Sequence, residues 1–236
     1  LGDEGRDALV IKRILVEHHP PLLGPGTSIG KMYLGHLYYY MMAVAMAISW
    51  LNPVAPAVMV ALIGTGAVFL IYYLGKLLFD WKAGLTAAAL YSVSFVVITY
   101  SRSSWNPNPA PFFTILAMIG WVWAHQKKQY RYLLLSGAAV SAAVQMHYLC
   151  LILLLIFGCL AWLEMRLQTS VQKIKFITAG IGGVVVFLAG MRPWWLFEFK
   201  HNFMNSRAMM DIFFGGNGAV SANPLSLLVR PGPIYF

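Results

Sequence analysis

We expect this sequence to adopt an all-α fold, a polytopic transmembrane helical bundle with external juxtamembrane amphipathic helices. Of its 236 residues, 59% are hydrophobic and 11% are charged, whereas soluble domains are about half apolar and about a quarter charged. A soluble chain of this size could not bury so much apolar surface. Four of the eight acidic residues lie in the first 17 positions, and long stretches elsewhere contain none. This zoning is typical of membrane spans joined by short loops, and the composition excludes disordered proteins.

Six apolar runs predict the helices. Val54–Leu74 has 21 residues, which at a rise of 1.5 Å per residue give about 32 Å, enough to cross a bilayer core. Leu133–Met165 would extend about 50 Å, so we interpret it as two short helices that meet at a polar break around Gln145–His147. The other runs are Met32–Leu51, Ala83–Tyr100, Pro109–Ala124 and Ile177–Phe197.

Basic residues orient these spans. The net charge is +9, and three short connections are basic: 76–82, 127–131 and 166–175. Two spans separate each connection from the next, so all three share one side, which the positive-inside bias places in the cytoplasm. The charge therefore predicts a membrane partner and no nucleic acid. The opposite side then holds Ser101–Asn108, the break at Gln145–Tyr148 and the tail from Glu198 onward.

The run Met32–Leu51 allows two interpretations. As a span it would put the acidic N-terminal segment in the cytoplasm; along the outer interface, it would leave that segment outside. Its tyrosines, with Trp50, favour the interface. We therefore expect three regions: a first external loop with juxtamembrane helices (1–53), about six transmembrane helices, two of them short (54–198), and the start of a further external loop (199–236). Because the chain begins at Leu1 and ends in an apolar segment, we interpret it as a fragment of a longer protein.

The first external loop holds an acidic pair, Asp3 and Glu4, at the start of a predicted amphipathic helix over Arg6–Glu17. Adjacent helical side chains point in different directions, so one carboxylate can face a cleft while the other braces it. A carboxylate at the mouth of a membrane cavity suits general-base work. The alternative is a solvated acid or a helix cap.

Other polar side chains sit at the same predicted face. Arg102 can hold a phosphate or pair with an acid, although its loop also suits a capped turn. His147 is an ionisable residue at the outer break, which suits a functional role, although a hydrogen-bonded histidine in helix packing is the alternative. Arg192 ends the last span, where it would contact a lipid headgroup or anchor the interface. No metal-ligand spacing, P-loop, nucleophile elbow or dinucleotide fingerprint occurs, which leaves soluble ATPase, hydrolase and dehydrogenase functions without support.

Taken in order, these features resemble a known family. The acidic pair, the amphipathic helix, His19–Pro20–Pro21–Leu22, the aromatic run Leu37–Tyr40, two spans and the Ser101–Arg102 turn are similar to the GT-C class of membrane glycosyltransferases. The branch that they resemble most contains protein O-mannosyltransferases and aminoarabinose transferases. The resemblance extends over nearly the whole chain, as the N-terminal half of the catalytic membrane module.

The resemblance implies transfer of a hexosyl or pentosyl group from a polyprenyl-phosphate donor to a lipid or protein acceptor on the extracytoplasmic face. Asp3 matches the family's base in the first external loop, Glu4 its neighbour, and Arg102 the arginine that opens the second external turn. Two positions depart from the family: Asn108 stands where an Asp is common, and His147 where relatives often carry Lys.

From this resemblance we expect Asp3 and Glu4 to be catalytic, and three basic residues to bind the donor phosphate, Arg102, His147 and Arg192. The expected substrate pocket comprises Tyr38, Asn106, Asn108 and Gln145. We expect an integral protein of the plasma (inner) membrane, with membrane lipids as neighbours and no cofactor. A divalent cation stays open as an alternative, but one acidic pair supplies too few ligands to support a cation site. The rival functions are a multi-span transporter or lipid flippase, which would place ionisable residues near mid-membrane, and a non-catalytic scaffold.

Overall fold

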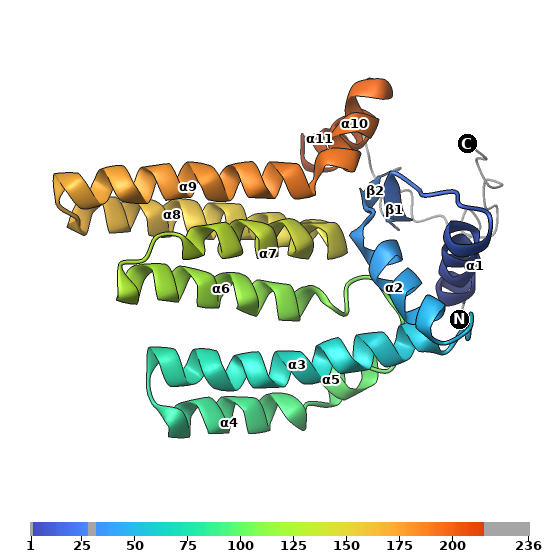
Figure 1. Cartoon of the computed structure of the whole chain (residues 1–236), viewed down its shortest axis with the longest axis horizontal. Helices are drawn as coiled ribbons and strands as arrows, with labels where there is room; N and C mark the ends of the chain where they lie inside the picture. The colour runs from blue at the N-terminus through green and yellow to red at the C-terminus, as the bar shows by residue number, and fades with distance from the viewer. Residues whose placement is uncertain (1, 28–31, 215–236) are drawn as a thin grey trace.

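A computed structural model describes residues 2–27 and 32–214 of the chain. These residues are almost wholly helical, with one pair of short strands near the N-terminus (Figure 1). The elements are α1 (Gly2–Val16), β1 (Leu23–Gly26), β2 (Tyr33–Gly35), α2 (Leu37–Ile48), α3 (Ala55–Leu78), α4 (Trp81–Ser92), α5 (Phe95–Tyr100), α6 (Ala110–Lys127), α7 (Tyr132–Met146), the 3-10 helix η1 (Tyr148–Leu151), α8 (Ile152–Leu167), α9 (Ser170–Gly190), α10 (Arg192–Lys200) and α11 (Met204–Phe214). The predicted all-α helical bundle is confirmed. The rest of the predicted last loop, 215–236, lies outside the described residues.

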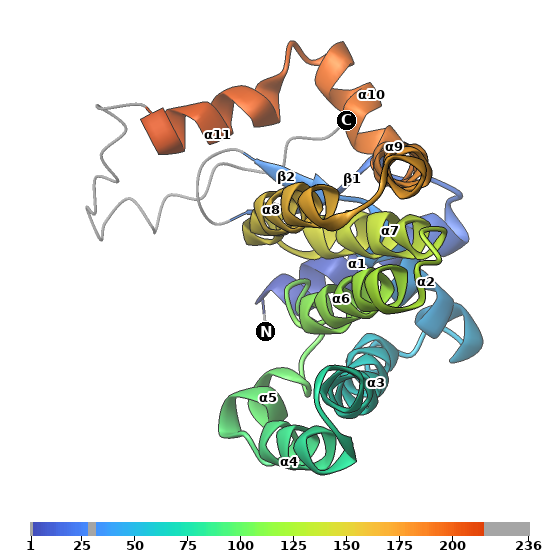
Figure 2. The same cartoon turned by 90° about the vertical axis from the view of Figure 1, so that its left-hand side faces the viewer.

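The bundle is built by neighbouring helices in the packing order α4, α3, α6, α7 and α9, and the axis of α8 lies along theirs (Figures 1 and 2). Three helices of the described chain are long and apolar enough to cross a bilayer: Ala55–Leu78, Tyr148–Leu167 and Ser170–Gly190. Their surfaces carry many exposed large apolar side chains, as expected for helices that face lipid. The chain is therefore an integral membrane protein.

Glycines allow two of these helix pairs to approach closely. A Cβ atom at Gly84 in α4 would lie 2.4 Å from the Tyr72 carbonyl oxygen of α3, and one at Gly137 in α7 would lie 2.1 Å from the Gly183 carbonyl oxygen of α9. No real side chain fits such distances. Small residues at these contacts let the backbones pack directly, which is a common way to hold helices together in a membrane.

The three basic connections lie at one end of the bundle. Figure 1 shows the α3–α4, α6–α7 and α8–α9 turns together at the left, and α1, α2, both strands and α10 at the right. This is the arrangement that the count of spans predicts. We call these the basic end and the site end. That the basic end faces the cytoplasm stays a prediction from the positive-inside bias.

The long run 133–165 is divided as predicted. Helix α7 ends at Met146, and His147 has an extended backbone (φ −156°, ψ 131°) before η1 and α8 continue the chain. The predicted single run Ala83–Tyr100 is also divided, into α4 and the short α5, because Ser94 adopts an extended conformation (φ −64°, ψ 123°). Both breaks lie toward the site end (Figure 1).

The run 32–51 forms only a short helix. Helix α2 has 12 residues, about 18 Å at 1.5 Å per residue, which is less than a bilayer core. It packs against α1 in a buried cluster that includes Ile11, Tyr39 and Met42. Trp50 and Leu51, with φ of 57° and 64°, then turn the chain into α3. An element of this length and position is compatible with an interfacial helix and too short for a span.

The strands were not predicted. They form an antiparallel pair in which Leu23 faces Gly35 and Gly26 faces Tyr33. A Cβ at Gly24 would lie 2.0 Å from the Gly35 carbonyl oxygen, so the close approach requires glycine. With four and three residues, the strands are too short for an alternating pattern to reveal them.

Candidate functional site

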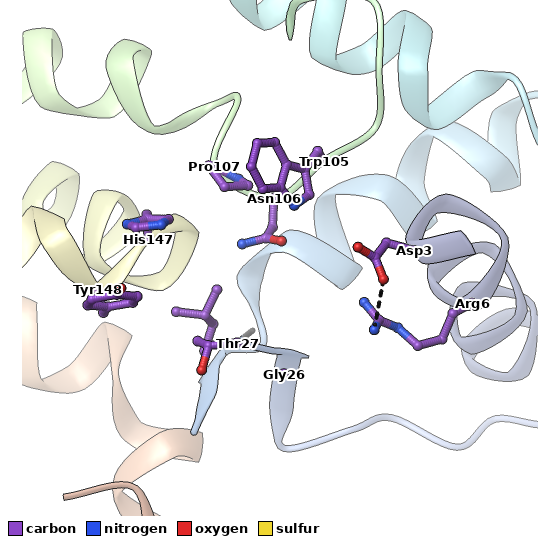
Figure 3. Close-up of a pocket in the computed structure, with 10 residues that line it drawn as sticks. Asp3, Arg6, Gly26, Thr27, Trp105, Asn106, Pro107, His147 and Tyr148 are labelled. Atoms are coloured by element: carbon purple, nitrogen blue, oxygen red, sulfur yellow. Dashed lines mark ion pairs between the residues drawn. The ribbon is translucent and has the colours of Figure 1, made fainter. Parts of the chain in front are cut away.

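A cavity of about 270 Å³ opens at the site end of the bundle. It lies between α1, the strand pair, the loop before α6 and the α7–η1 break, which are four segments far apart in the sequence (Figure 3). Trp105 and Pro107 contribute to its wall. Its polar lining consists of Asp3, Arg6, Thr27, Asn106, His147 and Tyr148.

The acidic pair is divided between this cavity and its scaffold. The side chain of Asp3 is 65% exposed and lines the cavity, across from His147 (Figure 3). The Glu4 carboxylate instead accepts a hydrogen bond from the Ser104 backbone N–H at 3.0 Å. One acid thus faces the cavity, and its neighbour fixes the loop that forms the facing wall.

Arg6 is a cavity residue that the sequence interpretation missed. One turn along α1 from Asp3, its Nη1 lies 3.2 Å from Asp3 Oδ1, and its Nη2 lies 3.0 Å from Asp7 Oδ1. Asp7 is buried and also accepts a hydrogen bond from the Tyr39 hydroxyl at 3.2 Å. Burial raises the pKa of Asp7, while Arg6 and the Tyr39 hydroxyl act against that rise. The i, i+3 spacing of Asp3 and Arg6 was the signal available in the sequence.

The loop between α5 and α6 is held on both sides of Ser104. Its N–H bonds to Glu4, and its carbonyl oxygen accepts a hydrogen bond from the Tyr38 hydroxyl. Burial raises the pKa of Tyr38, which keeps this hydroxyl protonated as a donor. Further along, Asn106 Nδ2 donates to the Met146 carbonyl oxygen at 2.8 Å. Helices α1, α2 and α7 therefore all fix the cavity wall.

The hydrogen bond from Asn106 holds the backbone of Met146, the residue directly before His147. The His147 Nδ1 atom accepts a hydrogen bond from the Leu149 N–H at 3.2 Å, so the neutral ring carries its hydrogen on Nε2. Burial lowers the pKa of His147, which favours that neutral form at pH 7. The ring is stacked on Tyr148, with centroids 4.7 Å apart. It offers the cavity one N–H donor in a fixed tautomer.

Gln145 is placed in the scaffold and does not line the cavity. Its Oε1 accepts from the Leu37 N–H at 3.3 Å, and its Nε2 lies 3.3 Å from the carbonyl oxygens of Ser141 and Gly190. A Cβ at Gly35 would lie 2.2 Å from Gln145 Cγ. One buried amide thus joins α2, α7 and α9 beside the cavity.

The other expected residues occupy different places. Tyr38 is fully buried behind the loop, and Asn108 folds back on its own loop through the carbonyl oxygens of Tyr100 and Ser103, at 2.6 and 2.9 Å. Arg102 and Arg192 are exposed at the end of α5 and the start of α10, and neither is among the described residues that line the cavity. Of the expected residues, Asp3, Asn106 and His147 are brought together.

Within the part of the chain that the structure describes, no three His, Cys, Asp or Glu side chains gather in a group that could hold a metal ion. The polar groups that line the cavity are one carboxylate, one guanidinium, one amide, one imidazole and two hydroxyls. Such a set can accept a proton and bind an anion.

The chain matches the model of a known family. The family model described as dolichyl-phosphate-mannose-protein mannosyltransferase matches residues 35–196, about two thirds of the chain. The matched range contains the α5–α6 loop and His147 and begins after α1, so Asp3 and Arg6 lie outside it. No curated protein and no solved structure matches the chain.

Proposed function

This chain belongs to the dolichyl-phosphate-mannose-protein mannosyltransferase family, so it is a membrane glycosyltransferase of the GT-C kind, and we propose that it transfers a sugar from a polyprenyl-phosphate donor to an acceptor on the extracytoplasmic face. A polyprenyl-phosphate sugar has an apolar tail and a polar head, so it suits a site at the end of a membrane bundle. Its prenyl tail remains among apolar helices, while its phosphate and sugar require polar partners at the interface. The cavity at the site end, opposite the basic connections, is the place where both conditions meet.

In the proposed reaction, Asp3 acts as the general base. It takes the proton of the acceptor hydroxyl or amine, whose oxygen or nitrogen forms the new bond to the anomeric carbon of the sugar. The bond between that carbon and the phosphate oxygen breaks with inversion, and polyprenyl phosphate leaves with the electron pair. The observation that carries this proposal is the exposed Asp3 carboxylate across the cavity from His147 (Figure 3).

Recognition of the donor phosphate is assigned in this proposal to His147, which presents a neutral Nε2–H donor. Arg102 and Arg192 remain proposed phosphate contacts from outside the cavity lining. No hydrogen bond or ion pair occupies either guanidinium among the described residues. Asn106, held through Met146, would hydrogen-bond the sugar with its remaining amide oxygen. We further propose that the protein acts in the plasma (inner) membrane in glycosylation of the cell envelope.

The test uses the full-length protein in detergent, incubated with labelled polyprenyl-phosphate sugars and candidate protein or lipid acceptors. We expect loss of the glycolipid, release of polyprenyl phosphate and label in an acceptor. Asp3→Asn should lower the rate at least about a hundredfold, the usual range for removal of a general base. Glu17→Gln, which neutralises an exposed acid at the far end of the same helical segment, is the matched control and should leave the rate unchanged. In a second arm the protein is reconstituted into vesicles, where label that crosses the membrane without acceptor modification would instead indicate a transporter.

A further inference from the structure

The Arg6 guanidinium makes two unequal contacts. Its Nε and Nη2 atoms both donate to Asp7 Oδ1, at 3.1 and 3.0 Å, while Nη1 lies 3.2 Å from Asp3 Oδ1. The Asp7 side chain is 4% exposed and the Asp3 side chain is 65% exposed. One edge of the guanidinium is therefore held in a buried site, and its other end reaches the open cavity.

The contact between Arg6 and the buried Asp7 is the stronger of the two. Asp7 also accepts the Tyr39 hydroxyl, and removing the cation would leave a buried carboxylate without a charged partner, which is costly. The contact with Asp3 is different, because exposed ion pairs contribute about 0–1 kcal/mol. An anion that enters the cavity can therefore take Nη1 from Asp3 at little cost, without moving Arg6 away from Asp7.

We propose that Arg6 is a phosphate-binding residue of the donor site and that it exchanges Asp3 for the donor phosphate when the lipid-linked sugar binds. This rests on the proposed function. Before the donor binds, the Arg6 guanidinium is paired with the Asp3 carboxylate. Once Nη1 turns to the phosphate, the carboxylate is released beside the sugar. The donor thus frees the base that takes the proton of the acceptor.

This exchange has a consequence for the order of events. An acceptor that arrives before the donor meets a carboxylate that is still paired with Arg6. An acceptor that arrives after it meets a free base next to the anomeric carbon. The arrangement therefore favours binding of the donor first, and it couples the base to the presence of the leaving group.

A double-mutant cycle on ligand binding tests the exchange without requiring sugar transfer. The full-length protein in detergent is titrated with farnesyl phosphate, which carries the phosphate on a short prenyl chain, and with inorganic phosphate as a second arm. The variants are Asp3→Asn, Arg6→Gln and the double variant. Arg13→Gln removes the same charge from an exposed position of α1 and is the matched control. The cycle is repeated in an Asp7→Asn background, where loss of Arg6 leaves no buried unpaired carboxylate and should not impair folding.

We expect Arg6→Gln to weaken farnesyl phosphate binding about tenfold, the scale of one charge-assisted hydrogen bond, while Arg13→Gln leaves it unchanged. Asp3→Asn should tighten binding several-fold when Arg6 is present, because the competitor for Nη1 is gone. In the Arg6→Gln protein the same change should have a much smaller effect. Inorganic phosphate should bind more weakly than farnesyl phosphate.

Equal effects of Asp3→Asn in both Arg6 backgrounds, or unchanged binding in Arg6→Gln, would overturn the exchange. Equal binding of the two phosphates would overturn its assignment to a lipid-linked donor. The proposed function fails separately, if no labelled polyprenyl-phosphate sugar is consumed although the cycle shows coupling. Transfer that proceeds while the cycle is additive would leave the function standing and remove the exchange.

Discussion

The two ends of the bundle each hold a carboxylate beside a cation, but the two carboxylates are bonded very differently. At the basic end, the Glu164 side chain is 4% exposed and receives Lys128 Nζ at 2.9 Å and Gln168 Nε2 at 2.6 Å, with His125 Nδ1 on its other oxygen. At the site end, the Asp3 side chain is 65% exposed and has one ion pair at 3.2 Å.

The difference separates an acid that joins helices from the acid that we propose as the base. Glu164 uses both oxygens to tie the α6–α7 corner to α8, and its side chain is buried away from any substrate. Asp3 remains open to the cavity, and its partner is held mainly by Asp7. Exposure and incomplete bonding, more than residue type, mark the carboxylate that can act as a base.

The largest expected effect is a difference in activity and stability between variants of Asp3 and Glu164. Asp3→Asn should abolish transfer and leave the unfolding temperature unchanged, because the exposed ion pair contributes little to stability. Glu164→Gln should do the reverse: it should lower the free energy of unfolding by about 1–3 kcal/mol through weakened buried hydrogen bonds, with unchanged activity per folded molecule. Thermal unfolding and transfer rates measured on both variants check this. A loss of activity in Glu164→Gln equal to that of Asp3→Asn would remove the distinction.

The next effect lies in the contact between Gly35 and Gln145. Gly35→Ala would place a Cβ 2.2 Å from Gln145 Cγ, and forcing it in should cost about 1–3 kcal/mol, as overpacking usually does. Gly158→Ala is the control, since no atom lies within 4 Å of its Cβ and alanine favours a helix. Thermal unfolding of the two variants should move in opposite directions. A Gly35→Ala protein as stable as wild type would contradict the packing described here.

A smaller effect on the transfer rate is expected for Glu4, the neighbour of Asp3. Glu4→Gln keeps an oxygen that accepts the Ser104 N–H, so transfer should fall only a few-fold, whereas Glu4→Ala removes the acceptor and should cost about 1 kcal/mol of stability. Steady-state rates and thermal unfolding report both. Complete inactivation of Glu4→Gln in a folded protein would instead show that Glu4 itself takes part in the chemistry.

The smallest effect concerns pH. Because burial lowers the pKa of His147 in the folded protein, the unfolded state takes up a proton first as the pH falls. The stabilising contribution of the neutral ring is therefore present above about pH 6.5, the ordinary value, and is lost below it. His147→Gln, which stays uncharged, should lack this component. Unfolding curves between about pH 8 and pH 5 should show wild type losing more stability than the variant, and parallel curves would contradict the lowered pKa.

Much of the architecture was predictable, because it follows from length and apolar content. The break near Gln145–His147 follows from a run too long for one span, and the shared side of the basic connections from counting spans. The division of Asp3 from Glu4 also follows local geometry, since adjacent helical side chains diverge. These features depend on residues close together in the chain.

What escaped prediction depends on contacts across the fold. Gln145 was expected in the pocket, but the missing Cβ of Gly35 lets its amide reach α2 and α9. Arg6 was counted as part of an amphipathic helix, because only the folded structure shows that Asp7 is buried against Tyr39. The spacing of Asp3 and Arg6 was visible in the sequence; which edge of the guanidinium is anchored was not.

The central claim is that Asp3 removes the acceptor proton in a cavity that it shares with His147. A single-turnover experiment with labelled polyprenyl-phosphate mannose tests it most directly, using full-length wild type and Asp3→Asn at saturating acceptor. We predict that both proteins bind the donor and that only wild type converts it, with the variant slower by at least about a hundredfold. Conversion by Asp3→Asn at the wild-type rate would contradict the claim.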